Sequence, residues 1–139
     1  MKTADAMEVL SALAPAEGPQ TPELGTRGDV AFLRLASGTA PLRWAVVSTP
    51  GDRWFSLEVD GGFSLDYFEE GTSDEDGRAI LTRYVDYALQ YVAGNAVHSR
   101  RGSLGIPELE LVTERESVRL RRSLWAQIRT LAGFEQRRH

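Results

Sequence analysis

The sequence has no cysteine, one lysine, two histidines and no long apolar run near its start. Without cysteine there is no disulfide framework, thiolate zinc site or cysteine nucleophile, which is typical of proteins in a reducing cytosol. Residues 1–14 include Asp5 and Glu8, so this segment resembles neither a signal peptide nor a membrane span. We therefore expect a cytoplasmic protein.

Residues able to carry catalysis are scarce. His139 is the last residue, and His98 has no second histidine or patterned carboxylate near it, so neither indicates a metal site or an acid–base pair. No nucleophile elbow is present, and neither 61–62 nor 102–105 has the lysine and following helix of a phosphate loop. The sequence thus predicts no enzyme, no catalytic residue, no cofactor and no metal.

Length and composition favour one globular domain. The chain has 139 residues, of which 42% are hydrophobic and 26% charged, enough for one core without covalent staples. The net charge of -4 is unevenly spread. Residues 52–76 hold nine acidic residues against Arg53, whereas residues from 98 onward hold nine arginines against five glutamates. This polarity predicts electrostatic recognition of a partner.

The residue pattern predicts an α+β fold over 1–139. We expect an antiparallel β-meander of about four strands packed against a long amphipathic helix, with a C-terminal β-hairpin and a short helix. The predicted segments are an N-terminal helix at 1–14, a loop at 15–28, the sheet at 29–68, the main helix at 73–93, a loop at 99–105, and a hairpin with a terminal helix at 108–132. Ser73 is the expected cap of the main helix.

Turn lengths predict the strand registers. A two-residue Pro50-Gly51 turn pairs Val46 with Phe55, and a three-residue turn at 60–62 pairs Val59 with Phe63. The resulting apolar face consists of Leu42, Trp44, Val46, Phe55, Leu57, Val59, Phe63, Leu65 and Tyr67. The opposite face carries polar side chains together with Trp54 and Phe68, which face each other. A turn at 114–115 pairs Leu109 with Leu120 and Glu108 with Arg121.

The acidic residues have two interpretations. Their spacing does not match an EF-hand loop, and Glu58 with Asp66 form a pair across a hairpin rather than in an evident deep cleft. They either cap a helix and solvate a loop or recognise a basic partner. Trp54 is either an interface anchor on the open side of the sheet or is buried under the N-terminal segment.

Nucleic-acid binding is disfavoured despite the arginines. Aromatic residues interleaved with them are lacking apart from Trp125, two of the arginines face glutamates, and the net charge is negative.

Residues 43–95 carry a resemblance to a known family. A tryptophan-bearing strand leads to DRWFSLEVDGGFSLDYFEEG, then to an acidic linker and the helix ILTRYVDYALQYVAG. This segment resembles the small immunity proteins of bacterial polymorphic-toxin and interbacterial-competition systems. The resemblance implies a cytosolic antitoxin that binds a cognate toxin domain, with a basic cleft, and occludes its active site. The expected partner contacts are Trp54, Glu58, Asp66, Glu69, Glu70, Asp74 and Glu75.

Two other functional classes remain open. One is a small-molecule-binding domain or enzyme with a pocket between sheet and helix, lined by Tyr84, Tyr87 and Tyr91. The other is a structural or oligomer-forming domain. A deep cavity with convergent polar groups would favour the first, and a symmetric dimer would favour the second.

Overall fold

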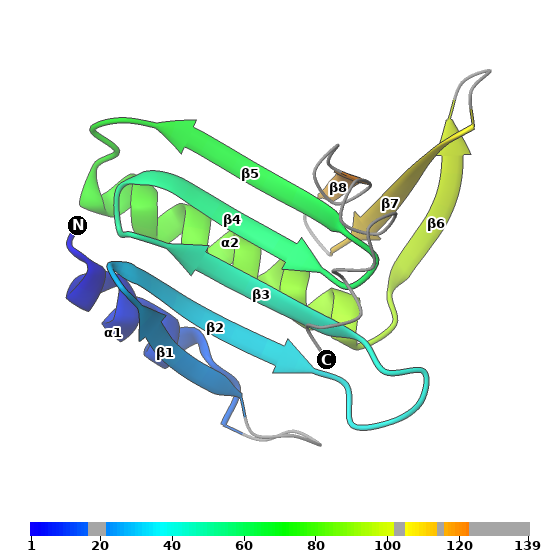
Figure 1. Ribbon diagram of the computed structural model, residues 1–139, viewed down its shortest axis with the longest axis horizontal. Coiled ribbons are helices and arrows are strands. Elements are labelled where there is room, and N and C mark those ends of the chain that lie inside the picture. The colour runs from blue at the N-terminus through cyan, green and yellow to red at the C-terminus, as the bar shows by residue number, and fades with distance from the viewer. Residues whose placement is uncertain (17–21, 102–104, 114–115, 123–139) are drawn as a thin grey trace.

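The computed structural model describes residues 1–16, 22–101, 105–113 and 116–122. The described chain has the predicted α+β class, but its two helices accompany one antiparallel sheet of eight strands, rather than a meander of about four strands with a separate hairpin (Figure 1). The helices are α1 (Thr3–Leu13) and α2 (Asp74–Val92). The strands are β1 (Glu23–Arg27), β2 (Val30–Ala36), β3 (Trp44–Thr49), β4 (Arg53–Val59), β5 (Phe63–Glu69), β6 (Ala96–Arg101), β7 (Ile106–Val112) and β8 (Ser117–Arg122).

Both helices lie on the same side of the strands β1 to β5, behind the sheet in Figure 1. The strand order is β1-β2-β3-β4-β5-β8-β7-β6, and every neighbouring pair is antiparallel. Side chains of β2, β3 and β4 alternate between buried and half-buried, apart from Arg53 at the start of β4, which is exposed. This alternation is typical of a sheet that has one face in the core and one face open.

The main helix α2 forms as its sequence predicts. The Ser73 hydroxyl accepts a hydrogen bond from the Asp76 N–H, and three acidic residues occupy the first turn, where the helix dipole favours negative charge. Gly94 ends the helix at φ 90°, a conformation that glycine adopts without strain. The buried side of the helix includes Tyr84, Tyr87 and Tyr91 together with its aliphatic residues.

The β3–β4 register differs from the prediction. Val47 pairs with Leu57 and Ala45 with Val59, so the expected pairing of Val46 with Phe55 was wrong. The connection is longer than two residues: β3 continues to Thr49, and the Thr49 hydroxyl binds the Gly51 N–H at 2.9 Å and the Trp54 carbonyl at 2.7 Å. The register moves by an odd number of residues, which exchanges the two faces of β3.

As a result, three residues expected in the core lie elsewhere. Trp44 and Val46 are half-buried on the face away from the helices, while Ala45 and Val47 are fully buried against them. Leu42 lies before β3 and is 71% exposed. The backbone N–H of Trp44 donates a hydrogen bond to the Asp60 carboxylate at 2.8 Å, and this bond aligns the start of β3 with the end of β4.

The other two predicted registers are confirmed. In the β4–β5 hairpin, Val59 pairs with Phe63 and Leu57 with Leu65. The β7–β8 pairs are those predicted, with apolar and opposite-charge partners alternating. The hairpin is not separate from the meander, because β8 pairs with β5 through Phe63 and Ser64. In Figure 1, β6 and β7 lean away from the rest of the sheet.

Two strands were not predicted. Residues 15–28 and 99–105 were expected to be loops, but the structure has β1 within the first and the end of β6 within the second. Both are edge strands with little apolar content, so hydrophobic alternation does not mark them. A Cβ at Gly25 of β1 would lie 3.1 Å from the Phe32 ring, so glycine at this position allows the ring to approach the strand closely. The predicted terminal helix lies outside the described residues.

Candidate functional site

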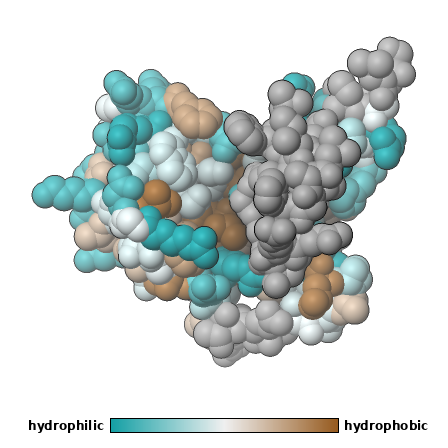
Figure 2. Space-filling view, viewed as in Figure 1, coloured by the Kyte–Doolittle hydropathy of each residue, from teal (hydrophilic) through white to brown (hydrophobic). Residues whose placement is uncertain are grey.

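The face of the sheet away from the helices is the candidate site, and we call it the open face. It combines aromatic, aliphatic and charged side chains from five neighbouring strands, which Figure 2 shows as hydrophobic patches among hydrophilic ones. From β1 to β5 its residues are Glu23, Gly25, Arg27, Val30, Phe32, Arg34, Ala36, Trp44, Val46, Ser48, Trp54, Ser56, Glu58, Ser64, Asp66 and Phe68.

An aromatic pair lies at one end of the open face. Trp54 of β4 and Phe68 of β5 are directly opposite each other, as the sequence predicts. Trp54 is half-buried and Phe68 is 75% exposed. Helix α1 lies on the other side of the sheet, so it does not cover Trp54. Exposed aromatic side chains beside polar groups are typical of protein-binding surfaces.

Two of the predicted acidic contacts share this face. Asp66 lies opposite Ser56, and Glu58 lies opposite Ser64, so the two carboxylates are on neighbouring strands and diagonal to each other. The Ser64 hydroxyl donates to the Asp66 carboxylate at 3.1 Å. Asp66 is exposed and Glu58 is half-buried. Trp54, Phe68, Asp66 and Glu58 therefore form one continuous surface, which we call the β4–β5 patch.

The other four predicted contacts lie around the connection from β5 to α2. Glu69 shares the helix side of β5 with Tyr67, whose hydroxyl donates to it, and lies opposite Arg53. Glu70 is exposed in the connection, and Asp74 and Glu75 are in the first turn of α2. Asp74 binds the chain's own amino terminus at 2.8 Å. The predicted residues are thus divided between the open face and the start of α2.

A groove of about 560 Å³ runs beside the patch. Its lining residues are Glu23, Arg27, Val30, Phe32, Arg34, Trp44, Val46, Ser48 and Glu58. The Arg27 guanidinium lies 5.6 Å from the Phe32 ring centre, and that of Arg34 lies 5.9 Å from the Trp44 ring centre. A second groove of about 420 Å³ shares Arg34 and Trp44 with the first.

Sequence reasoning missed this groove for two reasons. Strand β1, which supplies Glu23 and Arg27, was expected to be a loop, and the predicted register placed Trp44 and Val46 in the core. The opposite charges of Glu23 and Arg34, which pair across β1 and β2, were the available signal.

The tyrosines considered for a pocket between sheet and helix are packed into the core. Tyr84, Tyr87 and Tyr91 are each no more than 3% exposed, and none of them lines either groove. Burial raises the pKa of Tyr84 to about 12, and burial together with a hydrogen bond to Glu116 raises that of Tyr87 to about 12. Burial also raises the pKa of Tyr91.

An alkaline titration tests this packing. The phenol groups have raised folded pKa values, so they stabilise the fold fully below pH 10, and this contribution is lost as pH rises toward 12. We expect little phenolate absorbance from these three tyrosines up to about pH 11, followed by a cooperative increase as the chain unfolds; Tyr67, which is only half-buried, is replaced by phenylalanine for this measurement. Three tyrosines that titrate reversibly near pH 10 in a folded chain would contradict the packing. The matched reference is the same titration in denaturant.

Within 1–16, 22–101, 105–113 and 116–122, no group of three or more histidine, aspartate or glutamate side chains is placed to hold a metal ion. Neither of the helices described is long and apolar enough to cross a bilayer.

No protein-family model, curated protein or solved structure matches the chain.

Proposed function

We propose that this chain is an immunity protein that binds a cognate bacterial toxin domain in the cytoplasm and occludes its active site. The β4–β5 patch carries the proposal: an aromatic pair with Phe68 75% exposed lies beside the Asp66 carboxylate, on a face that the helices leave uncovered. The resemblance of residues 43–95 to immunity proteins gives the class of partner. Residues 52–76 are mostly acidic, so the complementary surface of the partner should be basic.

The patch has the composition of a protein interface. Aromatic side chains contribute large contact areas at low entropic cost, and interface affinity concentrates in a few such residues. Carboxylates beside them attract a cationic partner and raise the association rate, which an antitoxin requires. Because Glu58 and Asp66 lie on adjacent paired strands of one hairpin, their carboxylates are presented together on the same face.

The acidic residues at the start of α2 have a different role in this proposal. Asp74 lies in the first turn of α2, outside the open face, so it is not a central contact in this proposal. Glu70 and Glu75 are exposed and lie outside the open face, so they add to the negative field around the patch without being central contacts.

Co-expression tests the proposal. The open reading frame beside the gene for this chain is expressed in a bacterial host alone and together with the chain. We expect toxicity from the neighbour alone, rescue by the chain, and a complex that co-purifies. A harmless neighbour, or a toxic one that is neither bound nor neutralised, would contradict the proposal. A symmetric dimer whose interface buries the patch would instead favour an oligomer-forming domain.

Substitutions in the patch test its role. We expect Trp54→Ala or Phe68→Ala to raise the Kd for the toxin by about 30-fold, the effect of losing an interface anchor worth about 2 kcal/mol. The matched control is Val97→Ala, because Val97 is 60% exposed on β6, away from the patch. Binding that is weakened equally by all three substitutions, or by none, would rule out the patch.

The charge of the patch has its own test. We expect Asp66→Asn to slow association and to reduce its dependence on salt, with little change in the dissociation rate. Asp86→Asn is the control, since Asp86 is an exposed carboxylate on α2. Stopped-flow association at two ionic strengths measures both variants. An equal response of the two would show that the steering charge lies elsewhere.

A further inference from the structure

The described part of the chain leaves the outer edge of β1 without a neighbouring strand. β1 is the first strand in the sheet order, and β2 pairs with its inner side. Figure 1 shows β1 at one margin of the sheet, with α1 behind it. Such an edge presents a row of N–H and C=O groups that can pair with another strand. The residues of β1 indicate which strand fits this edge.

The turn of the β1–β2 hairpin determines which backbone groups of β1 point outward. Arg27 and Val30 are paired across a two-residue turn at 28–29, so their backbone groups bond to each other. Hydrogen-bonded and non-hydrogen-bonded pairs alternate along an antiparallel ladder. Every second residue of β1 therefore bonds to β2, whereas the N–H and C=O groups of Leu24 and Thr26 face away from it.

A second copy of β1, running antiparallel, complements this edge. When Gly25 lies opposite Gly25 of the second copy, Leu24 lies opposite Thr26, and each such pair can exchange both of its outward hydrogen bonds. The same register places Glu23 opposite Arg27 of the second copy, once on each side of the two-fold axis. These charged pairs are not hydrogen-bonded through the backbone, so their side chains approach closely. A shift of two residues would lose both ion pairs.

Side chains on the open face add an apolar contact to this arrangement. A Cβ at Gly25 would lie 3.1 Å from the Phe32 ring, so the ring reaches over β1 toward the edge. Two paired copies of β1 therefore bring two half-buried Phe32 rings to either side of the two-fold axis. The Arg27 guanidinium lies 5.6 Å from the centre of the same ring, and this stacking positions it at the edge.

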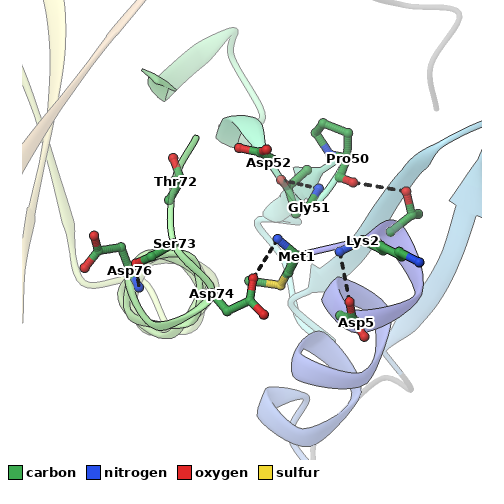
Figure 3. Close-up of polar contacts among 12 residues, drawn as sticks. Met1, Lys2, Asp5, Pro50, Gly51, Asp52, Thr72, Ser73, Asp74 and Asp76 are labelled. Carbon is green, nitrogen blue, oxygen red and sulfur yellow. Dashed lines mark hydrogen bonds and ion pairs between the residues drawn. The ribbon is translucent and has the colours of Figure 1, made fainter. Parts of the chain in front are cut away.

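The hairpin that carries this edge is attached to the rest of the fold. The Thr3 hydroxyl of α1 lies 2.6 Å from the carbonyl oxygen of Asp29, in the β1–β2 turn, and 3.0 Å from that of Pro50. Figure 3 shows the start of α1 beside the β3–β4 connection, where the Asp5 carboxylate accepts a hydrogen bond from the Lys2 N–H at 2.9 Å. An edge held in this way loses little conformational freedom when a second strand binds.

The opposite edge of the sheet lacks this complementarity. Strand β6 carries Arg100 and Arg101 and has no acidic residue, so two copies paired through it would gain no ion pair. Charged side chains of one sign on an edge strand commonly prevent such pairing. In β1, by contrast, the charges are of both signs and lie at opposite ends of the strand.

We propose that this chain forms a symmetric dimer in which two copies of β1 pair antiparallel about Gly25 and extend the sheet across the two-fold axis. Arg27 of the second copy then lies beside Glu23 at the margin of the groove, so the partner completes the groove wall. The β4–β5 patch is separated from β1 by β2 and β3 and stays open. The two open faces lie on the same side of the joined sheet, so each dimer presents two patches. The inference goes beyond the proposed function and does not depend on it.

Sedimentation velocity of the full chain tests the dimer. We expect a monomer–dimer equilibrium between about 1 μM and 1 mM, the range of a small interface. Thr26→Pro removes an N–H that points outward, where an edge strand tolerates proline, so it should stay folded and raise the dimer Kd at least about tenfold. Thr26→Val, which keeps the N–H, is the matched control and should dimerise like the parent. A monomeric parent, or a dimer that Thr26→Pro does not weaken, would overturn the proposal.

A mixture of two charge variants tests the register. Glu23→Arg brings two arginines together and Arg27→Glu brings two glutamates together, so each variant alone should dimerise at least about tenfold more weakly. Mixed, the two variants form opposite-charge pairs at both ends of the strand, and heterodimers should recover most of the affinity. The control mixture is Glu70→Arg with Arg78→Glu, two exposed sites away from β1, which should dimerise like the parent alone and mixed. A first mixture without recovery would overturn the pairing about Gly25. Toxin binding enters neither readout, so failure here leaves the proposed function untouched.

Discussion

Val47→Asn is expected to lower the free energy of unfolding by about 3–5 kcal/mol, because it removes core packing and buries an amide without partners. Val47 is fully buried on β3, opposite Leu57 and facing the helices. Its neighbour Val46 is half-buried on the open face. Val46→Asn should therefore cost about 1 kcal/mol or less, because only partial burial and the strand preference of valine are lost.

Urea denaturation of the two variants measures this difference. The pair is informative because the register expected from a two-residue Pro50-Gly51 turn makes the opposite prediction, with Val46 inside and Val47 outside. A larger loss for Val46→Asn would show that β3 pairs in that other register. Equal losses would contradict the separation of the sheet into a core face and an open face.

Phe55→Ala should also destabilise the fold by about 3–5 kcal/mol, the usual cost of removing a buried aromatic ring. Phe55 is fully buried, lies 6.2 Å from the Tyr67 ring centre, and supports the helix at Gly77. The loss should also disturb the packing of the Met1 side chain against α2, because Gly77 lies beside both the Phe55 ring and that side chain. We therefore expect faster hydrogen exchange in α1 as well as a lower denaturation midpoint.

Ser56→Ala is the matched control for Phe55→Ala. Ser56 follows on the same strand and lies on the open face, so its substitution should change stability by no more than about 0.5 kcal/mol. A loss for Ser56→Ala comparable to that for Phe55→Ala would mean that the open face is also a packed core.

The candidate site could be predicted only in part. The sequence correctly predicted that one side of the sheet carries Trp54, Phe68, Glu58 and Asp66. Only a three-residue turn at 60–62 places the apolar residues of β4 and β5 on the same face, so the register of this hairpin could be predicted. The groove beside them was not predicted. It depends on β1, an edge strand without clear alternation, and on the face of β3.

The binding of Asp74 to the amino terminus was also beyond sequence reasoning. Acidic residues at a helix start have a sufficient local explanation in the helix dipole, so nothing in the sequence distinguishes Asp74 from Glu75. Only the packing of α1 beside α2 brings the ammonium of residue 1 to one of them.

The amino-acid sequence by itself determined the α+β class, the main helix with its cap and glycine stop, and the β4–β5 and β7–β8 registers. These features depend on periodicity, capping and turn chemistry over short spans, where local preference and burial agree. Tertiary structure alone decided which face of β3 lies in the core. It also decided that β1 and β6 form the two edges of the sheet and that the β7–β8 hairpin pairs with β5. Each of these depends on contacts between distant segments, since strands with weak alternation take their pairing from the neighbours that the fold provides.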